Sequence, residues 1–342
     1  MTSTINGFWH GAARLSGRID WSAALRTHDG QLDRMTATDL HQAGIGQRHQ
    51  KTLREVGLLG IRSGLLFIDK PTYPPALRHL PFAPAVLFYV GNVDLLSETC
   101  ISIVGARKCT QRAKDFTRTL AGRLAGSGLV IVSGLAYGVD HAAHHACLGR
   151  TVAVLGQGID RAYASRKAQD IEKIVKAGGL VLSEFPPYQP ASKHTFPQRN
   201  RIIAGLSIAT VVIEASMRSG SRITAKQALE YGREVMAVPG HPFDPQSKGC
   251  NQLISDGALL IQSAQDVRDA LGIRTEERHQ SAPETRVARQ IISALDGILT
   301  VDELFEKTGI SMPSLLMSIE SLELTGWIQR LSGDRIRLRI ET

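Results

Sequence analysis

From Thr99 to Leu271 short apolar runs alternate with helix-like amphipathic stretches, and this alternation limits what the chain can fold into. The apolar runs are, in order, CISIVGA, GLVIVSG, TVAVLGQG, GGLVLSE, SIATVVIEA, EVMAVPG and GALLI. Strands of consecutive Val, Ile and Leu are buried on both faces, because the helices that alternate with them cover both sides of a mainly parallel sheet. The pattern predicts an α/β domain with a Rossmann-like, doubly wound sheet over residues 96–271.

Smaller parts are predicted on either side of this domain. At 342 residues the chain is long for one hydrophobic core, so two or three domains are expected. Residues 1–95 are expected to form an N-terminal region with a small helical unit near residues 30–60. Residues 272–285 are polar and lack apolar periodicity, which is typical of a linker. Residues 286–342 have the pattern of three helices and a hairpin, which predicts a C-terminal winged-helix-like domain.

The charge of the chain favours an anionic partner. Its formal net charge is +8 and its pI about 9.5, which makes nucleic acid the leading class, although many proteins are mildly basic without such a role. Residues 284–342 carry seven basic and nine acidic side chains, so the positive excess lies before them.

The C-terminal domain is not expected to read duplex DNA. Its predicted recognition helix, residues 311–325, contains Glu320 and Glu323 and no Lys or Arg, although phosphate contacts normally need cations. Four arginines around the wing leave a weaker DNA contact open, beside protein contact or structural packing: Arg330, Arg335, Arg337 and Arg339.

Several classes of function lack support. No run of about 18 apolar residues could span a bilayer, and the N-terminus lacks the apolar core of a secretory signal, so we expect a cytoplasmic protein without membrane contact. No nucleophile with an adjacent base is visible, so we expect neither a catalytic residue nor a cofactor. His141 and His145 have the i, i+4 spacing of a metal pair, but no third ligand is apparent. We therefore predict no metal site and attribute His141, His144 and His145 to packing beside a helix start capped by Asp140.

The first predicted strand of the α/β domain ends in a cationic segment. Between Thr99 and Leu124 there are six Lys or Arg residues and one acid. Gly105 permits a tight turn there, and Arg107 can add forked hydrogen bonds to the phosphate that a helix start attracts. A solvated helix surface would explain these cations equally well. The chain has neither the GxGxxG pattern after this strand nor GxxxxGK[ST] anywhere, so NAD and ATP chemistry lose support.

Similar small residues recur where later strands end. Ser133, Gly134 and Gly138 follow the second strand and Gly156 and Gly158 the third, while a fourth group precedes a later helix: Ser219, Gly220, Ser221 and Thr224. Ligands of open α/β sheets bind beyond the carboxyl ends of the strands. An elongated polyanion could contact each of these loops in turn, whereas a mononucleotide would need one or two.

A second cationic segment of the α/β domain is KHTFPQRNRIIAGLS, residues 193–207. Arg199, Asn200 and Arg201 stand in succession at a predicted helix start and offer bidentate donors and a base-edge amide. An alternative left open is that Arg199 or Arg201 forms an internal ion pair with Glu184 or Glu214.

The series of motifs resembles the DNA-processing protein A (DprA/Smf) family. The segments that carry the resemblance are VGARKCT, VSGLAYGVDHAAHHACL, AVLGQGID, SEFPP, FPQRNRIIAGLS, EASMRSGSRITAKQALEYGREVMAVPG and GCNQLISDGA, and they cover the whole central domain. The resemblance implies a Rossmann-like domain that binds single-stranded DNA in a basic pocket, forms a homodimer and helps to load RecA recombinase in natural transformation. Where the family usually has Tyr-Pro, this chain has Tyr163 and Ala164.

By the same resemblance, the DNA-binding residues are drawn from five segments of the central domain. They are Gly105, Arg107, Lys108, Thr110, Ser133, Gly134, Gly138, Gly156, Gly158, Lys167, Arg199, Asn200, Arg201, Ser219, Gly220, Ser221 and Thr224. The competing hypothesis is a nucleotide-processing enzyme of a related Rossmann-like fold, in which Glu214 or Glu230 would act as acid or base.

Overall fold

The structure is a computed structural model that forms two compact units, residues 1–271 and 272–342. It describes residues 63–78, 80–273, 285–324, 327–331 and 333–338. The predicted helical unit near residues 30–60 and nearly all of the predicted linker, residues 272–285, lie outside this part of the chain.

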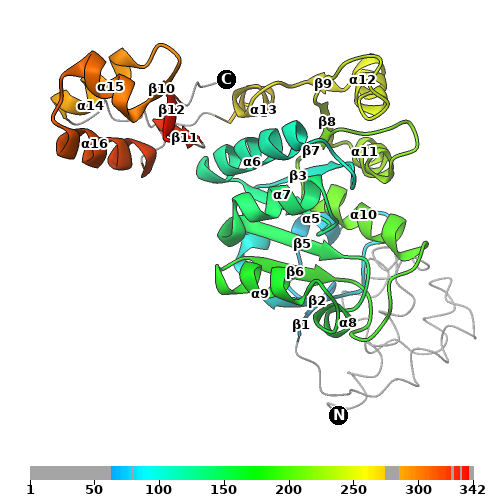
Figure 1. The fold of residues 1–342 in the computed structure, drawn as a ribbon. Coiled ribbons are helices and arrows are strands. Elements are labelled where there is room, and N and C mark those ends of the chain that lie inside the picture. The colour runs from blue at the N-terminus through cyan, green and yellow to red at the C-terminus, as the bar shows by residue number, and fades with distance from the viewer. Residues whose placement is uncertain (1–62, 79, 274–284, 325–326, 332, 339–342) are drawn as a thin grey trace, which may run out of the picture. The chain divides into compact units, whose positions relative to one another are not determined.

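A nine-stranded sheet forms the centre of the first unit, in the order β1-β2-β6-β5-β4-β3-β7-β8-β9 (Figure 1). Its strands are β1 (Gly64–Phe67), β2 (Val86–Gly91), β3 (Cys100–Gly105), β4 (Val130–Ser133), β5 (Thr151–Leu155), β6 (Leu180–Ser183), β7 (Ala209–Ile213), β8 (Glu234–Ala237) and β9 (Leu259–Leu260). From β6 to β9 all neighbouring strands are parallel. The predicted Rossmann-like, mainly parallel sheet is confirmed.

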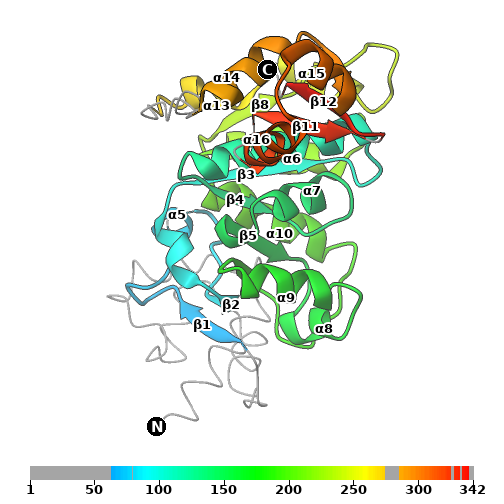
Figure 2. The same ribbon diagram turned by 60° about the vertical axis from the view of Figure 1, so that its left-hand side comes forward.

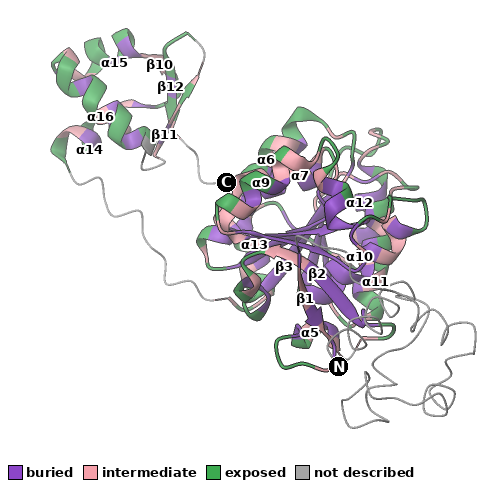
Figure 3. Ribbon diagram, turned by 90° about the horizontal axis from the view of Figure 1, so that it is seen from below, coloured by how far each residue is buried: buried purple, intermediate pink, exposed green. Residues whose placement is uncertain are grey.

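Helices cover both faces of the sheet. The helices are α5 (Pro75–Arg78), α6 (Gln111–Gly126), α7 (Val139–Ala146), α8 (Ile159–Tyr163), α9 (Ala168–Lys176), α10 (Thr195–Leu206), α11 (Gly220–Glu230), α12 (Lys248–Ser255) and α13 (Ala264–Ala270). Helices α6, α7 and α9 lie on one face, and α10 and α11 lie on the other (Figures 1 and 3). Every residue of β4, β5, β6 and β7 is therefore buried, as their continuous apolar sequences predict.

The sheet takes in two strands from before residue 96. Strand β1 pairs antiparallel with β2, and β2 pairs antiparallel with β6, with Phe88 opposite Ser183. The boundary expected at residue 96 therefore falls inside the sheet. Strand β2 lies within the expected N-terminal region yet pairs with a strand about ninety residues further along, so its partner is set by the tertiary fold and not by the local sequence pattern.

The second unit contains helices α14, α15 and α16 (Figure 2) and a three-stranded sheet in the order β10-β12-β11 (Figure 3). Its elements are α14 (Arg286–Ala294), β10 (Ile298–Thr300), α15 (Val301–Thr308), α16 (Met312–Leu324), β11 (Ile328–Leu331) and β12 (Arg335–Leu338). Ile291, Leu304 and Ile319 are fully buried in its core. The predicted winged helix is confirmed, with β10 as a strand that the sequence pattern does not predict.

Within the described residues, no helix is both long enough and apolar enough to cross a membrane.

The direction in which the chain winds reverses between β3 and β7. Strands β3 to β6 add successively on one side, whereas β7, β8 and β9 add on the other side of β3. The loops after β3 and β7 therefore diverge, which opens a crevice at the carboxyl ends of these strands. Gly105, the last residue of β3, packs so closely on β7 that a Cβ there would collide with the carbonyl oxygen of Ile213.

We expect Gly105→Ala to destabilise the protein by about 1–3 kcal/mol, the usual range for overpacking a close contact. Gly126→Ala is the matched control, because a Cβ at Gly126 meets no atom within 4 Å and alanine suits a helix. Thermal unfolding followed by circular dichroism measures both variants. Equal stability of the two would contradict the close approach of β3 and β7.

Candidate nucleic-acid interface

A cleft of about 300 Å³ opens at the crevice between β3 and β7. The loop after β3, the start of α10 and the start of α11 line it, and nine of the predicted site residues face it: Gly105, Arg107, Lys108, Arg199, Asn200, Ser219, Gly220, Ser221 and Thr224. Segments up to about 120 residues apart in the sequence therefore meet at one edge of the sheet, as expected for residues that follow parallel strands.

The loop after β3 supplies the exposed cations of the cleft. Arg107 and Lys108 are both exposed. Thr110, although predicted as a binding residue, caps α6 by accepting a hydrogen bond from Ala113 N–H at 3.1 Å. Its backbone N–H and hydroxyl donate to the two carboxylate oxygens of Glu214, at 2.8 and 2.5 Å. Thr110 and Glu214 therefore fix the loop that presents Arg107 and Lys108.

Helix α10 contributes an aromatic ring to the cleft. The Arg107 guanidinium lies over the Phe196 ring, 4.9 Å from its centroid, which is a cation–π contact. Phe196, Arg199, Asn200 and Ile203 all line the cleft, and they have the i, i+3, i+4, i+7 spacing of one helix face. From the sequence alone Phe196 could stack on a base, although an aromatic residue near a strand end is more often part of the core, and the structure places it in the cleft lining.

Arg199 lines the cleft but is almost fully buried, with only 4% of the residue exposed. Its guanidinium donates hydrogen bonds to the carbonyl oxygens of Gly134, at 2.6 Å, and Val154. Asp140 holds the same loop from the other side by accepting hydrogen bonds from the N–H groups of Gly134 and Ala136, at 3.1 and 3.4 Å. Arg199 therefore fixes the loop after β4 as well as lining the cleft.

Burial shifts the pKa values of both Arg199 and Asp140. It lowers the pKa of Arg199 to about 10, against the favourable effect of Asp140, so the guanidinium stays protonated at neutral pH. Burial raises the pKa of the Asp140 carboxyl, while Arg199 and the two backbone donors oppose that rise.

Arg201 does not line the cleft. It is 8% exposed and forms an ion pair with the fully buried Glu184, one of the internal pairings that the sequence left open. Of the two acidic partners considered from the sequence, Glu184 pairs with Arg201, whereas Glu214 accepts hydrogen bonds from Thr110.

Several predicted small residues shape the scaffold of the cleft without lining it. The Ser133 hydroxyl donates to the Ile103 carbonyl at 2.6 Å. Gly138 has a φ of +84° at the start of α7, and a Cβ there would collide with the Ala106 carbonyl. At Gly134 and Gly158 a side chain would meet Arg199 and the Pro186 carbonyl respectively, and at Gly156 it would press on Phe196. These glycines permit close packing of the loops behind the cleft.

Lys167 lies close to the cations of the cleft. Burial, followed by the charge of Arg199, lowers the pKa of Lys167 to about 8, whereas Asp140 and Asp170 act in the opposite direction. The lysine is only half-buried and is not among the lining residues. Lys167 therefore contributes positive electrostatic potential near the cleft and does not line the cleft itself.

The start of α11 closes the third side of the cleft. The Ser219 hydroxyl caps the helix by accepting a hydrogen bond from Ser221 N–H at 3.4 Å. Asn200 Nδ2 donates to the Gly220 carbonyl at 3.4 Å and links α10 to this helix start. Gly220 has open space around its Cα, so an anion can approach the backbone N–H groups there.

A larger cavity of about 680 Å³ lies between α11, β8 and α12. Its walls are mainly apolar, with Leu229, Val235 and Leu253, and of the predicted site residues it takes in Ser219. The smaller cleft is the better candidate site, because the cations, the aromatic ring and the helix start converge there.

Comparison with known proteins gives matches over nearly the whole described chain. Residues 64–272 match the family model described as DNA recombination-mediator protein A, and residues 275–334 match the DprA winged helix domain. Protein Smf of Escherichia coli is 34% identical over 327 residues, which are 89% of this chain and 87% of that protein. DNA processing protein DprA of Streptococcus pneumoniae is 47% identical over 201 residues, or 57% of this chain and 70% of that protein.

Two solved structures are similar to this one. The X-ray structure of DprA from Streptococcus pneumoniae has a TM-score of 0.68 at 34% identity and covers 78% of this chain and 97% of its own. A structure of DNA processing protein A from Helicobacter pylori, whose title describes a single-stranded DNA binding mode, has a TM-score of 0.56 at 32% identity and covers 62% and 96%. With family models that span both units and relatives of this identity, the chain belongs to the DprA/Smf family of DNA-processing proteins.

Proposed function

We propose that this protein binds single-stranded DNA along the cleft between β3 and β7, without sequence readout and without covalent chemistry of its own. The observation that carries the proposal is the convergence of two exposed cations, Arg107 and Lys108, with the Phe196 ring and the start of α11 in that cleft. Proteins that bind single strands without sequence preference combine a cationic groove with aromatic rings on which bases stack.

The exposed cations of the cleft and the start of α11 are suited to binding phosphate groups. Arg107 and Lys108 are solvent-exposed and line the cleft. They can therefore neutralise phosphates without breaking an ion pair that stabilises the fold. Backbone N–H groups at the start of α11 offer further donors beside Ser219 and Gly220. A strand of nucleotides would contact these two walls with successive phosphates.

The aromatic ring of Phe196 is suited to stacking with a nucleic-acid base. Phe196 is half-buried, and Arg107 covers its ring at 4.9 Å. A base can stack on such a ring or on the guanidinium plane, and neither contact distinguishes one base from another. Asn200, in the same face of α10, adds one amide that can bond to a base edge or a phosphate.

Family membership supports three finer proposals. The Helicobacter pylori relative is described as binding single-stranded DNA. By this relationship we infer that the chain acts with RecA recombinase on incoming DNA in natural transformation and that it works as a homodimer. We also infer that catalysis is absent.

The enzyme hypothesis finds less support in the proposed acid–base residues. Glu214 accepts two hydrogen bonds from Thr110, and Glu230 lies at the end of α11, 3.8 Å from Lys226 on an exposed surface. Neither residue lines the cleft. Incubation with nucleoside monophosphates separates the two functions: we expect no release of free base by protein that binds oligothymidine, and release at a steady turnover would favour the enzyme.

Replacing Arg107 tests the cleft most cleanly. We expect Arg107→Ala to weaken oligothymidine binding about tenfold, or about 1.4 kcal/mol, and to reduce the salt slope by about 0.7, because one phosphate contact is lost. Arg118→Ala is the control with the same change in net charge. Arg118 is exposed on α6 and pairs with Asp115 at 2.6 Å, away from the cleft lining.

Fluorescence anisotropy across a salt series gives affinity and slope together for both variants. Equal effects of Arg107→Ala and Arg118→Ala would mean that only the overall charge matters, and the cleft assignment would then be wrong. Arg199→Ala is a poorer test, because it also removes the bonds that hold the loop after β4.

Removing residues 284–342 should leave single-strand binding largely intact, with a loss below about tenfold. The C-terminal unit is compact by itself, and α16 carries no Lys or Arg. Two of its wing arginines already have partners, since Arg330 pairs with Glu323 at 3.6 Å and Arg337 donates to Gln329 at 2.9 Å. Full-length and truncated protein are compared at one salt concentration and in the same oligomeric state. A hundredfold loss would make the winged helix a principal DNA-binding element.

A further inference from the structure

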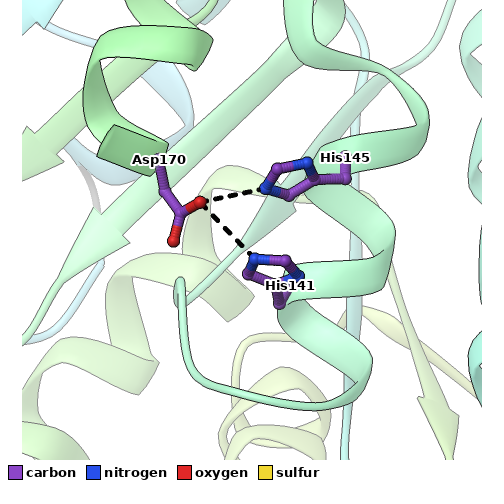
Figure 4. A group of neighbouring side chains, drawn as sticks. All are labelled: His141, His145 and Asp170. Atoms are coloured by element: carbon purple, nitrogen blue, oxygen red, sulfur yellow. Dashed lines mark hydrogen bonds and ion pairs between the residues drawn. The ribbon is translucent and has the colours of Figure 1, made fainter. Parts of the chain in front are cut away.

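Helices α7 and α9 bring two histidines and one carboxylate together at a place that the proposed DNA binding does not use. His141 and His145 lie one turn apart on α7, and Asp170 lies in the first turn of α9 (Figure 4). Both histidine Nε2 atoms face the same Asp170 oxygen, at 3.5 Å for His141 and 3.1 Å for His145. The two rings stack with their centroids 4.1 Å apart.

We propose that His141, His145 and Asp170 form a binding site for one divalent ion of the zinc class. Among the described residues these three offer one ligand atom each, all within 4.8 Å of one another. The sequence shows the histidine pair but not the third ligand, because Asp170 comes from a different helix, 25 residues after His145.

The spacing of the ligand atoms suits tetrahedral coordination. Zinc binds histidine nitrogen and carboxylate oxygen at about 2.0–2.2 Å, so ligand atoms of a tetrahedral site lie about 3.3 Å apart. The two measured nitrogen–oxygen distances, 3.1 and 3.5 Å, lie on either side of this value. The two Nε2 atoms lie within 4.8 Å of each other and their rings are nearly parallel, so rotation of the imidazoles toward a common point would bring three ligand atoms to three corners of one site.

The chemistry of the three residues selects the ion. Two imidazoles with one carboxylate suit zinc and its transition-metal neighbours, whereas magnesium and calcium prefer oxygen ligands throughout. An imidazole must be neutral to coordinate, so binding of the ion should weaken as the pH falls. Side chains of His141, His145 and Asp170 are 42%, 25% and 23% exposed, so an ion can enter from solvent.

His144, the third histidine of the group, is not a ligand. It is fully buried, its Nδ1 lies 2.7 Å from the Thr151 hydroxyl, and its Nε2 accepts a hydrogen bond from Leu135 N–H at 3.3 Å. The packing role predicted for the histidines therefore describes His144, while His141 and His145 lie on a neighbouring, partly exposed face of α7 beside Asp170.

A bound ion would join two helices that begin beside the cleft. Helix α7 starts at Val139, next to Asp140, and α9 starts directly after Lys167. Linking these helices through one ion would stabilise the folded state, because an ion that binds only the folded protein shifts the unfolding equilibrium. The site would thus act as a structural cross-link between α7 and α9.

Cobalt titration of the full chain, freed of any purification tag, tests the site directly. Tetrahedral cobalt has intense visible absorption, so we expect saturation at one ion per chain, displacement by zinc and no displacement by magnesium. His145→Asn and Asp170→Asn should each weaken binding at least about tenfold, because even loss of an outer-shell partner often does so. His241→Asn is the control, because His241 is exposed on another loop.

Thermal unfolding provides a second readout and shows that the variants are folded. Zinc should raise the melting temperature of the wild type and of His241→Asn, and at the same concentration raise those of His145→Asn and Asp170→Asn by less. Absence of saturable binding in the wild type would overturn the proposal. So would equal cobalt affinity in all four proteins, which would place the ion at histidines elsewhere in the chain.

Discussion

The reversal of winding between β3 and β7 is the constraint on which the rest of this structure depends. Because the two strands are neighbours while their following helices leave toward opposite faces, the sheet edge cannot close above them. The loop that carries Arg107, the start of α10 and the start of α11 all meet at this opening. The site therefore does not require a short sequence motif, because the loops that follow parallel strands lie together at one edge of the sheet even when they are distant in sequence.

Charge at this edge is divided between two kinds of arginine. Arg199 and Arg201 are withdrawn from solvent and hold backbone carbonyls or Glu184, which satisfies cations that would otherwise be costly to bury. Arg107 and Lys108 remain exposed, and Thr110 with Glu214 fixes the loop beneath them. The buried cations therefore position the cleft, and the exposed ones give it the charge that a polyanion needs.

The sequence predicted the sheet, the winged helix and the main loops of the cleft, because apolar periodicity and glycine at strand ends are local signals. It could not assign side chains within α10, where Arg199, Asn200 and Arg201 follow one another about 100° apart around the helix and so cannot all face one cleft. Docking of the helix on the sheet decides that Arg201 turns toward Glu184 and that Phe196 faces the cleft. Strand β2 and the Asp170 carboxylate escaped prediction for the same reason, since their partners come from distant segments.

The central claim is that a single DNA strand lies in the cleft between β3 and β7. Hydrogen–deuterium exchange of the full chain, with and without saturating oligothymidine, tests it most directly, because exchange reports protection segment by segment. The account predicts slower exchange in the loop after β3 and at the starts of α10 and α11, with little change in residues 286–338. Protection confined to the winged helix, or none at the cleft under saturating conditions, would contradict it.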